Sequence, residues 1–230
     1  MKMFPAEGLE IGPARRRAPK AGAGVRAYNA LLHSPLNMAK AKFDQRKALH
    51  AMLFVVTHLP KPANVYNVLK CLYYADRKHL QEYGRQIYGE TFYALEHGPV
   101  PSAAYEIIKY ANGRANWDLE FPEAYQLLQV NDIYVSARGA VDTDLLSRSD
   151  MACLLDAARK YGKMPFGKLK KLSHQGKAFE NADSNGEMKL ADLIDELRDG
   201  EAVALHLKNR NPGEVLAKRD SAHHAKPRAA

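Results

Sequence analysis

The chain has 230 residues, of which 46% are hydrophobic and 26% are charged, a balance typical of a soluble globular protein with one hydrophobic core. No apolar run approaches the roughly 18 residues that a membrane-spanning helix needs, and no apolar stretch of the signal-peptide kind follows the arginines near the N-terminus. We therefore expect a cytoplasmic protein that neither spans a membrane nor is exported.

The formal net charge of +8 is concentrated at the two ends of the chain. Residues 1–42 contain eight Lys and Arg against two Asp and Glu, and residues 198–230 contain seven against four. The segment 43–197 between them is nearly neutral, with nineteen basic and twenty acidic residues. We expect a disordered basic leader at 1–42, one domain at 43–197 and a low-order basic tail at 198–230. Met38 is a possible true start of translation, because the sequence after it reads as an ordinary protein beginning.

Two helices are predicted at the start of the domain. The first covers residues 43–59 and is ended by Pro60. From Val65 to Gly84, apolar residues recur every three or four positions, which indicates an amphipathic helix. Asn64 is placed to cap its N-terminus, and Gly84 can adopt the left-handed conformation that a helix C-cap needs.

Two short strands are predicted from their β-forming residues. Thr91–Leu95 is one, and residues 132–137 are the other, with Gly139 in the turn behind it. We expect these strands to build one small antiparallel sheet, to which residues 142–146 add a further edge.

The segment Gly98–Pro101 predicts a tight, extended connection, because each proline disfavours helical backbone at the residue before it. Ser102 then stands where the N-cap of the next helix is expected. A short helix is predicted near residues 123–127.

Three further helices complete the domain. One opens at Ser147 and ends at Gly162, a second runs from Pro165 through Leu172, and a third covers residues 188–197. The sequence as a whole predicts a mainly α-helical single domain of the α+β class with a small antiparallel β-sheet.

The residue types that carry most enzyme chemistry are present without a catalytic pattern. Cys71 and Cys153 each lie within an apolar helical pattern and are expected to be free, buried thiols; pairing of one with a histidine in catalysis is the alternative. The nine histidines are scattered, and the chain has no HExxH, CxxC or paired-carboxylate motif. We predict no metal, no cofactor and no enzymatic activity.

Asp76 and His79 allow two interpretations. They lie three residues apart, on one face of the predicted helix, as members of a catalytic or metal cluster would. They also fit a buried polar network, because a buried charge needs a partner, such as Arg77, Arg85 or a group on another helix.

A basic run between Ala157 and Phe179 has no acidic residue. Its members are Arg159, Lys160, Lys163, Lys168, Lys170, Lys171 and Lys177. A solvated helix face is one interpretation of this run, and a patch for an acidic partner or a phosphate backbone is the other.

An ordered set of residues runs from Tyr73 to Tyr105. It consists of Tyr73-Tyr74, Asp76-Arg77, His79-Leu80, Tyr83-Gly84-Arg85, Gly89-Glu90, a short aromatic strand and Gly98-Pro99-Val100-Pro101-Ser102. This order resembles the Panacea antitoxin domain, also described as SocA-like, which is found in bacterial and prophage toxin–antitoxin operons. Ser173-His174, Phe179 and Ala182 also match, so the resemblance covers residues 43 to 182.

The resemblance implies a non-enzymatic antitoxin that binds a cognate toxin protein and blocks it. An alternative that it also implies is a proteolytic adaptor that delivers the toxin to a ClpXP-type protease. The basic run and the basic ends favour a third reading, a nucleic-acid-binding regulator of its own operon.

Partner-binding residues are expected near the end of the long helix and near the turns that follow it. The candidates are Arg77, Tyr83, Arg85 and His97. Gly84, Gly98, Pro99 and Pro101 are expected to be architectural.

Overall fold

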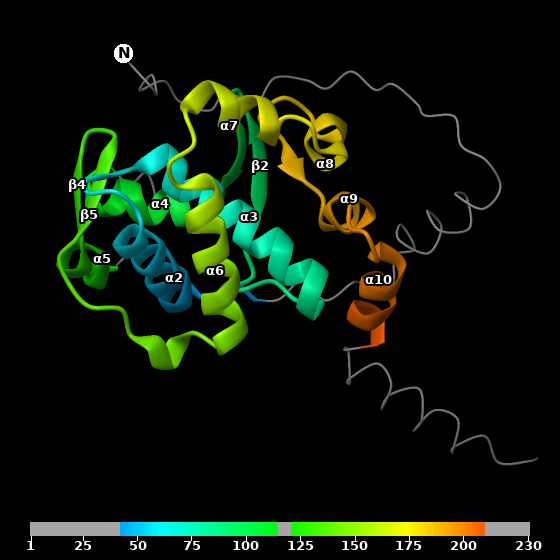
Figure 1. Ribbon diagram of the computed structural model, residues 1–230, viewed down its shortest axis with the longest axis horizontal. Helices are drawn as coiled ribbons and strands as arrows, with labels where there is room; N and C mark the ends of the chain where they lie inside the picture. Colours follow the sequence, from blue (N-terminus) through cyan, green and yellow to red (C-terminus); the bar gives the residue numbers. More distant parts are fainter. Residues whose placement is uncertain (1–41, 115–120, 210–230) are drawn as a thin grey trace, which may run out of the picture.

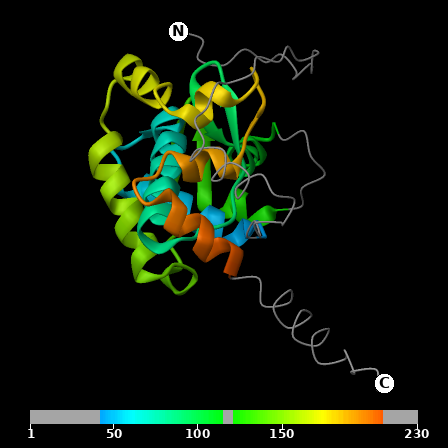
Figure 2. The same ribbon diagram turned by 90° about the vertical axis from the view of Figure 1, so that its right-hand side faces the viewer.

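The computed structural model describes residues 42–114 and 121–209 of the chain. The long helix α3 (Val65–Tyr83) crosses the middle of the described fold, and α6 (Arg148–Tyr161) lies alongside it (Figure 1). Helix α2 (Gln45–His58) packs on both. The turned view shows α9 (Leu190–Asp195) and α10 (Gly200–Asn209) in front of α3 (Figure 2).

Helix α3 begins and ends where the sequence predicts. The side chain of Asn64 accepts a hydrogen bond of 2.9 Å from the backbone N–H of Tyr66, which caps the helix. Gly84 adopts the left-handed conformation with a φ of 62°, and its N–H donates to the carbonyl of Leu80. Both predicted caps are confirmed.

Buried side chains of α3 reach every hydrophobic cluster of the described fold. Leu69 and Leu72 lie in the main core with α2 and α6. Three other residues of α3 each belong to a smaller cluster. Tyr66 packs with α7, and Tyr73 packs with β2 and α8. Leu80 packs with α9 and α10. The helix is therefore the common element of the hydrophobic interior.

The strands form two antiparallel sheets, not the single sheet that we expected. In the first, β5 (Tyr134–Ala137) pairs with β1 (Ala63–Asn64) on one side and with β4 (Leu128–Asn131) on the other. In the second, β2 (Phe92–Leu95) lies between β3 (Gly98–Pro101) and β6 (Glu187–Met188). The α+β class is confirmed, whereas the expected pairing of β2 with β5 is wrong because each strand finds its partners elsewhere.

Three local predictions also need correction. Residues 98–101 are not only a connection, because they form β3 and pair with β2 along its whole length. Residues 142–146 do not form a strand, since Thr143–Leu145 is a 3₁₀-helix capped by the side chain of Asp142. Ser102 is the first residue of α4 (Ser102–Ala111), and the N-cap position is occupied by Pro101, which makes no side-chain capping hydrogen bond.

The remaining helices follow the expected order. Helix α6 opens with a capping box, in which the side chain of Ser147 accepts from the N–H of Asp150 and the carboxylate of Asp150 accepts from the N–H of Ser147. The other expected helices are α5 (Pro122–Leu127), α7 (Phe166–Ser173) and α9, whereas α8 (Lys177–Asn181) is an additional helix that was not predicted.

Helix α10 occupies part of the segment that we expected to be a low-order tail. Its residues Val203, Ala204 and Leu207 are buried with Leu80 of α3, so apolar spacing continues beyond residue 198. The rest of that tail, and the leader apart from Lys42, lie outside the described residues. Among the helices that the structure describes, none has the length and apolar character needed to cross a membrane.

Candidate partner-binding surface

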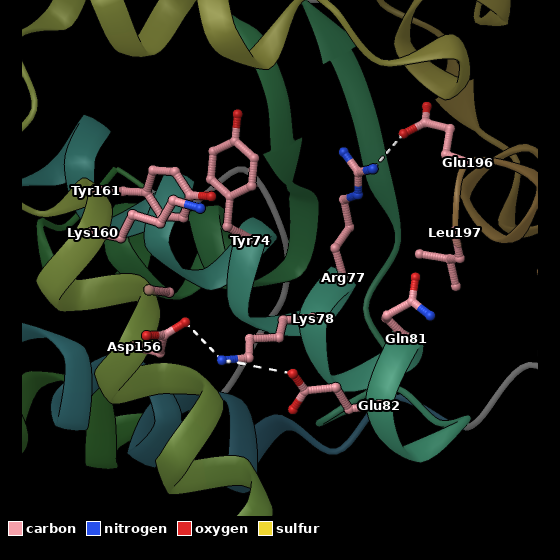
Figure 3. Close-up of a pocket in the computed structure, with 11 residues that line it drawn as sticks. Tyr74, Arg77, Lys78, Gln81, Glu82, Asp156, Lys160, Tyr161, Glu196 and Leu197 are labelled. Carbon is pink, nitrogen blue, oxygen red and sulfur yellow. Dashed lines mark hydrogen bonds and ion pairs between the residues drawn. The ribbon is translucent and has the colours of Figure 1, made fainter. Parts of the chain in front are cut away.

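An open groove of about 460 Å³ lies between α3 and α6 and reaches the end of α9 (Figure 3). It is lined by Tyr74, Arg77, Lys78, Gln81 and Glu82 of α3, by Asp156, Ala157, Lys160 and Tyr161 of α6, and by Glu196 and Leu197. The α3 positions are three or four residues apart, which places them on one side of the helix. We call this site the α3–α6 groove.

Two stacked tyrosines form one part of the groove wall. The rings of Tyr74 and Tyr161 lie 4.0 Å apart between centroids with an interplanar angle of 18°. The hydroxyl of Tyr74 is buried and has no hydrogen-bond partner among the described residues. Aromatic rings of this kind offer large, rigid contact area at low entropic cost.

Ion pairs cross the groove between elements that are far apart in the sequence. Arg77 Nη2 lies 2.7 Å from Glu196 Oε2, and Glu196 also accepts a hydrogen bond from the backbone N–H of Ala178. Lys78 Nζ lies 2.7 Å from Asp156 Oδ2. The first pair joins α3 to the end of α9, and the second joins α3 to α6.

Lys160 is the cation of the groove that has no ion-pair partner among the described residues. It is exposed, and its Nζ lies 5.3 Å from the centroid of the Tyr161 ring. An incoming carboxylate can therefore pair with Lys160 without breaking an existing ion pair.

Of the four predicted partner-binding residues, Arg77 lines the groove. Tyr83 is 46% exposed at the end of α3, and its ring lies 4.7 Å from that of His79. Arg85 is bound to Asp150 Oδ1 at 2.9 Å and to Ser147 Oγ at 3.1 Å. Arg77, Tyr83 and Arg85 thus belong to the C-terminal half of α3 and the loop behind it.

The structure places the fourth residue, His97, at a distance from the other three. It lies in the turn between β2 and β3, where its carbonyl accepts a hydrogen bond of 3.0 Å from the hydroxyl of Tyr66. Tyr66 and Tyr83 stand at opposite ends of α3, about 25 Å apart at 1.5 Å per residue. The four residues therefore do not form a single site.

Asp76 and His79 have the partners of a buried polar network. Asp76 accepts from the N–H of Ile87 at 2.6 Å and from the side chain of Gln86 at 3.0 Å. Burial raises the pKa of Asp76 to about 6, although these hydrogen bonds and His79 lower it. Both side chains are enclosed, so neither is presented to a ligand in this structure.

His79 links that network to α6. Its Nδ1 is 2.9 Å from the carbonyl oxygen of Arg85, and its Nε2 is 3.0 Å from Ser149 Oγ and 3.1 Å from Asp150 Oδ1. The network therefore fixes the Gly84 turn against the start of α6, a structural role.

The thiols are buried and free, as the sequence predicts. Burial raises the pKa of Cys71 to about 12 and that of Cys153 to about 11, so both are protonated at neutral pH and are poor nucleophiles. In the part of the chain that the structure describes, no group of three or more His, Cys, Asp or Glu is placed to hold a metal ion.

Sequence reasoning did not find the groove. Asp156, Lys160 and Tyr161 look like any exposed end of an amphipathic helix, and Glu196 lies far along the chain from Arg77. The available signal was the run of polar and aromatic residues from Tyr74 to Glu82 at helical spacing, which marks a face of α3 that the core does not use.

Residues 68–179 match the family model described as antitoxin SocA-like, Panacea domain. The matched segment includes nearly all of α3, the β2–β3 hairpin, and the whole of α6 and α7. The match to the SocA-like Panacea model confirms the resemblance seen between Tyr73 and Tyr105. No curated protein and no solved structure matches the chain.

Proposed function

We propose that this protein is an antitoxin that neutralises a cognate toxin by direct protein–protein binding, and that the toxin docks on the α3–α6 groove. The observation that carries the proposal is the position of the family match. Residues 68–179 contain both helices that build most of the groove, whereas Glu196 and Leu197 lie beyond the match. The groove is therefore largely a feature of the Panacea domain itself.

The chemistry of the groove supports binding to a protein. Its wall carries stacked tyrosines and Arg77, the residue types that most often anchor protein interfaces. Lys160 is exposed and can receive a carboxylate. Tyr83, exposed at the end of α3, extends the same helix toward a partner.

The experiment is co-expression of the full chain with the product of the neighbouring gene, scoring growth and co-purification. We expect that product alone to stop growth, and the full chain to restore growth and form a stable complex with it. A neighbour that is toxic but neither bound nor neutralised contradicts the antitoxin proposal.

A charge-reversal variant tests the groove. The change of Lys160 to Glu together with Glu82 to Arg alters two exposed groove residues without changing net charge. We expect at least a tenfold loss of toxin affinity, which corresponds to about 1.4 kcal/mol. The matched control, Arg148→Glu with Asp144→Arg, lies at the other end of α6 and should leave affinity unchanged. If the groove variant and the control variant bind the toxin with equal affinity, the toxin does not dock on the groove.

The half-life of the toxin separates neutralisation by occlusion from delivery to a protease. Occlusion predicts a long-lived toxin in a complex with the antitoxin. Faster degradation that requires both the antitoxin and a ClpXP-type protease would instead support the adaptor alternative.

A further inference from the structure

A group of exposed cations without ion-pair partners lies outside the groove. It consists of Arg159, Lys163, Lys168, Lys171 and Lys177, on the end of α6, the following loop, α7 and the start of α8. All five are exposed, and none forms an ion pair with the residues that the structure describes. We call these residues the α6–α7 basic surface. Lys160 belongs to the groove and is not counted among them.

The backbone beneath this surface is held firmly. The side-chain amide of Asn67 on α3 donates to the carbonyl oxygens of Tyr161 and Met164, at 3.2 and 3.0 Å, and so fixes the loop that carries Lys163. Helix α7 buries Leu169 against Tyr66. The cations are therefore presented on ordered backbone.

The arrangement of α7 directs its lysines to solvent. Leu169 and Ser173 face inward, and Lys168 and Lys171, three residues apart, lie on the exposed side. Lys170 marks the inner margin of the surface, because its Nζ lies 3.3 Å from His97 Nδ1 and 3.8 Å from Glu96 Oε1.

The composition of the surface favours a polyanion over a second protein. Lysine is depleted in protein interfaces, which depend on aromatic, apolar and arginine anchors. Among the exposed large hydrophobic residues, only Leu172 lies within this segment, at 37% exposure. Strongly hydrated point charges of one sign suit a regular row of phosphates, whose neutralisation releases condensed counterions.

We propose that the α6–α7 basic surface binds the phosphodiester backbone of a nucleic-acid duplex without sequence preference. This inference does not depend on the proposed antitoxin function, because it uses residues outside the groove. Backbone contacts of this kind set affinity and its salt dependence but carry no base readout.

The test measures binding of the full chain to a fluorescent DNA duplex of about 20 base pairs, by anisotropy, over a series of salt concentrations. The test variant changes Arg159, Lys163, Lys168 and Lys171 to Gln. The control variant changes four other exposed cations, Lys61, Arg114, Arg148 and Lys189, to Gln. Both variants lose the same charge and keep the terminal segments intact.

The wild-type and control proteins should bind with similar salt slopes. The test variant should lose about 0.9 units of slope, in log Kd against log salt, for each contact removed, or about 3 to 4 units in all. Its affinity should therefore fall most strongly at low salt. Thermal unfolding of all three proteins checks that the substitutions leave the fold intact.

Two DNA-binding results would overturn the proposal. If test and control variants bind DNA alike, net charge or the terminal segments account for binding. If the wild-type protein does not bind the duplex at low salt, the surface is not a nucleic-acid site.

Toxin binding and an RNA duplex supply further discrimination. The test variant should still neutralise the toxin, since Lys160 is unchanged; loss of neutralisation with no effect on DNA would assign the surface to the protein partner and overturn the proposal. An RNA duplex of the same length, tested in parallel, should bind through the same four cations. Comparison of the two dissociation constants then shows whether the surface prefers DNA or RNA.

Discussion

The Nζ atom of Lys70 donates a hydrogen bond of 2.7 Å to the carbonyl oxygen of Pro99, and the lysine is fully buried. This bond ties α3 to β3 across the interior. The Nζ atom also lies 5.1 Å from the centroid of the Tyr66 ring. Burial lowers the pKa of Lys70 to about 6, so the folded protein holds a neutral amine at neutral pH where the unfolded chain holds a charged one.

Stability should therefore rise with pH in the mildly alkaline range. The pKa of Lys70 is lower in the folded protein than in the unfolded chain. Its contribution to the free energy of unfolding is therefore present at high pH and is lost as pH falls toward 6. Between pH 7.5 and 8.5 we expect about 1.4 kcal/mol per pH unit from this group. Urea unfolding across that interval measures the slope, and Lys70→Met should flatten it.

The interval from pH 7.5 to 8.5 is chosen because other buried groups change the stability mainly at lower or higher pH. Burial raises the pKa of Glu90 to about 7 and that of Asp76 to about 6, so their contributions are present at low pH and are lost as pH rises through those values. Burial raises the pKa of Cys71 to about 12, which removes stability only above about pH 9. Equal slopes in wild type and Lys70→Met would contradict the account.

Removal of the Glu90 carboxylate should destabilise α4. Its Oε1 accepts from the N–H groups of Thr91 and Ala103, and its Oε2 accepts from that of Ala104 at 3.0 Å. We expect Glu90→Ala to lower the free energy of unfolding by at least about 2 kcal/mol, because these donors lose their acceptor. Ser102→Ala, at the predicted cap, should cost less than about 0.5 kcal/mol. Chemical denaturation of both variants measures the difference; the reverse order would return the capping role to Ser102.

Two aspartates of α6 should differ widely in their effect on stability. Asp150 is fully buried and lies 2.7 Å from Lys47 Nζ and 2.9 Å from Arg85 Nη2. Burial alone would raise the pKa of Asp150, but hydrogen bonds from His79, Lys47 and Ser147 hold it well below the usual range. We expect Asp150→Ala to cost about 3–5 kcal/mol, because it removes a fully buried carboxylate and leaves the partly buried cations Lys47 and Arg85 without their shared partner.

The control is Asp156, whose side chain is 53% exposed and pairs with Lys78. Asp156→Ala should cost less than about 1 kcal/mol, because surface ion pairs contribute little. Thermal unfolding of the two variants at neutral pH makes the comparison. Similar losses at both positions would show that the buried ion-pair cluster is not a special source of stability.

Substitution of alanine for Gly98 and for Gly167 should change the stability of the protein in opposite directions. Gly98 has a φ of 93°, and a Cβ there would lie 2.8 Å from Lys70 Nζ and 3.1 Å from His174 Cδ2. We expect Gly98→Ala to cost about 2 kcal/mol or more through strain and crowding. A Cβ on Gly167 would meet nothing within 4 Å, so Gly167→Ala should stabilise α7 by about 0.4–1 kcal/mol. The melting temperatures of the two variants should move in opposite directions, and a shared direction would refute this reasoning.

Local interactions explain which parts of the fold could be predicted from the sequence. Asn64, Gly84 and the Ser147–Asp150 capping box each act within four residues, so residue type and spacing reveal them. Helix α3 was predictable for the same reason, since its apolar period spans nineteen residues.

Long-range partners explain most of what could not be predicted. The N-terminus of α4 is capped by Glu90, which stands before a hairpin, so a local pattern points to Ser102 instead. Strand β2 pairs with β6, whose residues Glu187 and Met188 have no strand signal of their own. In the groove, Arg77 could be proposed from its place on α3, but its ion pair with Glu196 depends on how distant helices pack.

Because α3 supplies buried residues to every hydrophobic cluster of the described fold, the domain has no part that keeps its interior without this helix. A fragment that stops before Val65 would expose the apolar side of α2, and a fragment that begins after Tyr83 would expose the apolar sides of α6 and α9. The buried residues of the main cluster run from Ala48 to Ala158, so the nascent chain can complete that interior only once α6 has left the ribosome. Proteolytic cleavage within α3 should consequently unfold the whole domain at once, including the α3–α6 groove.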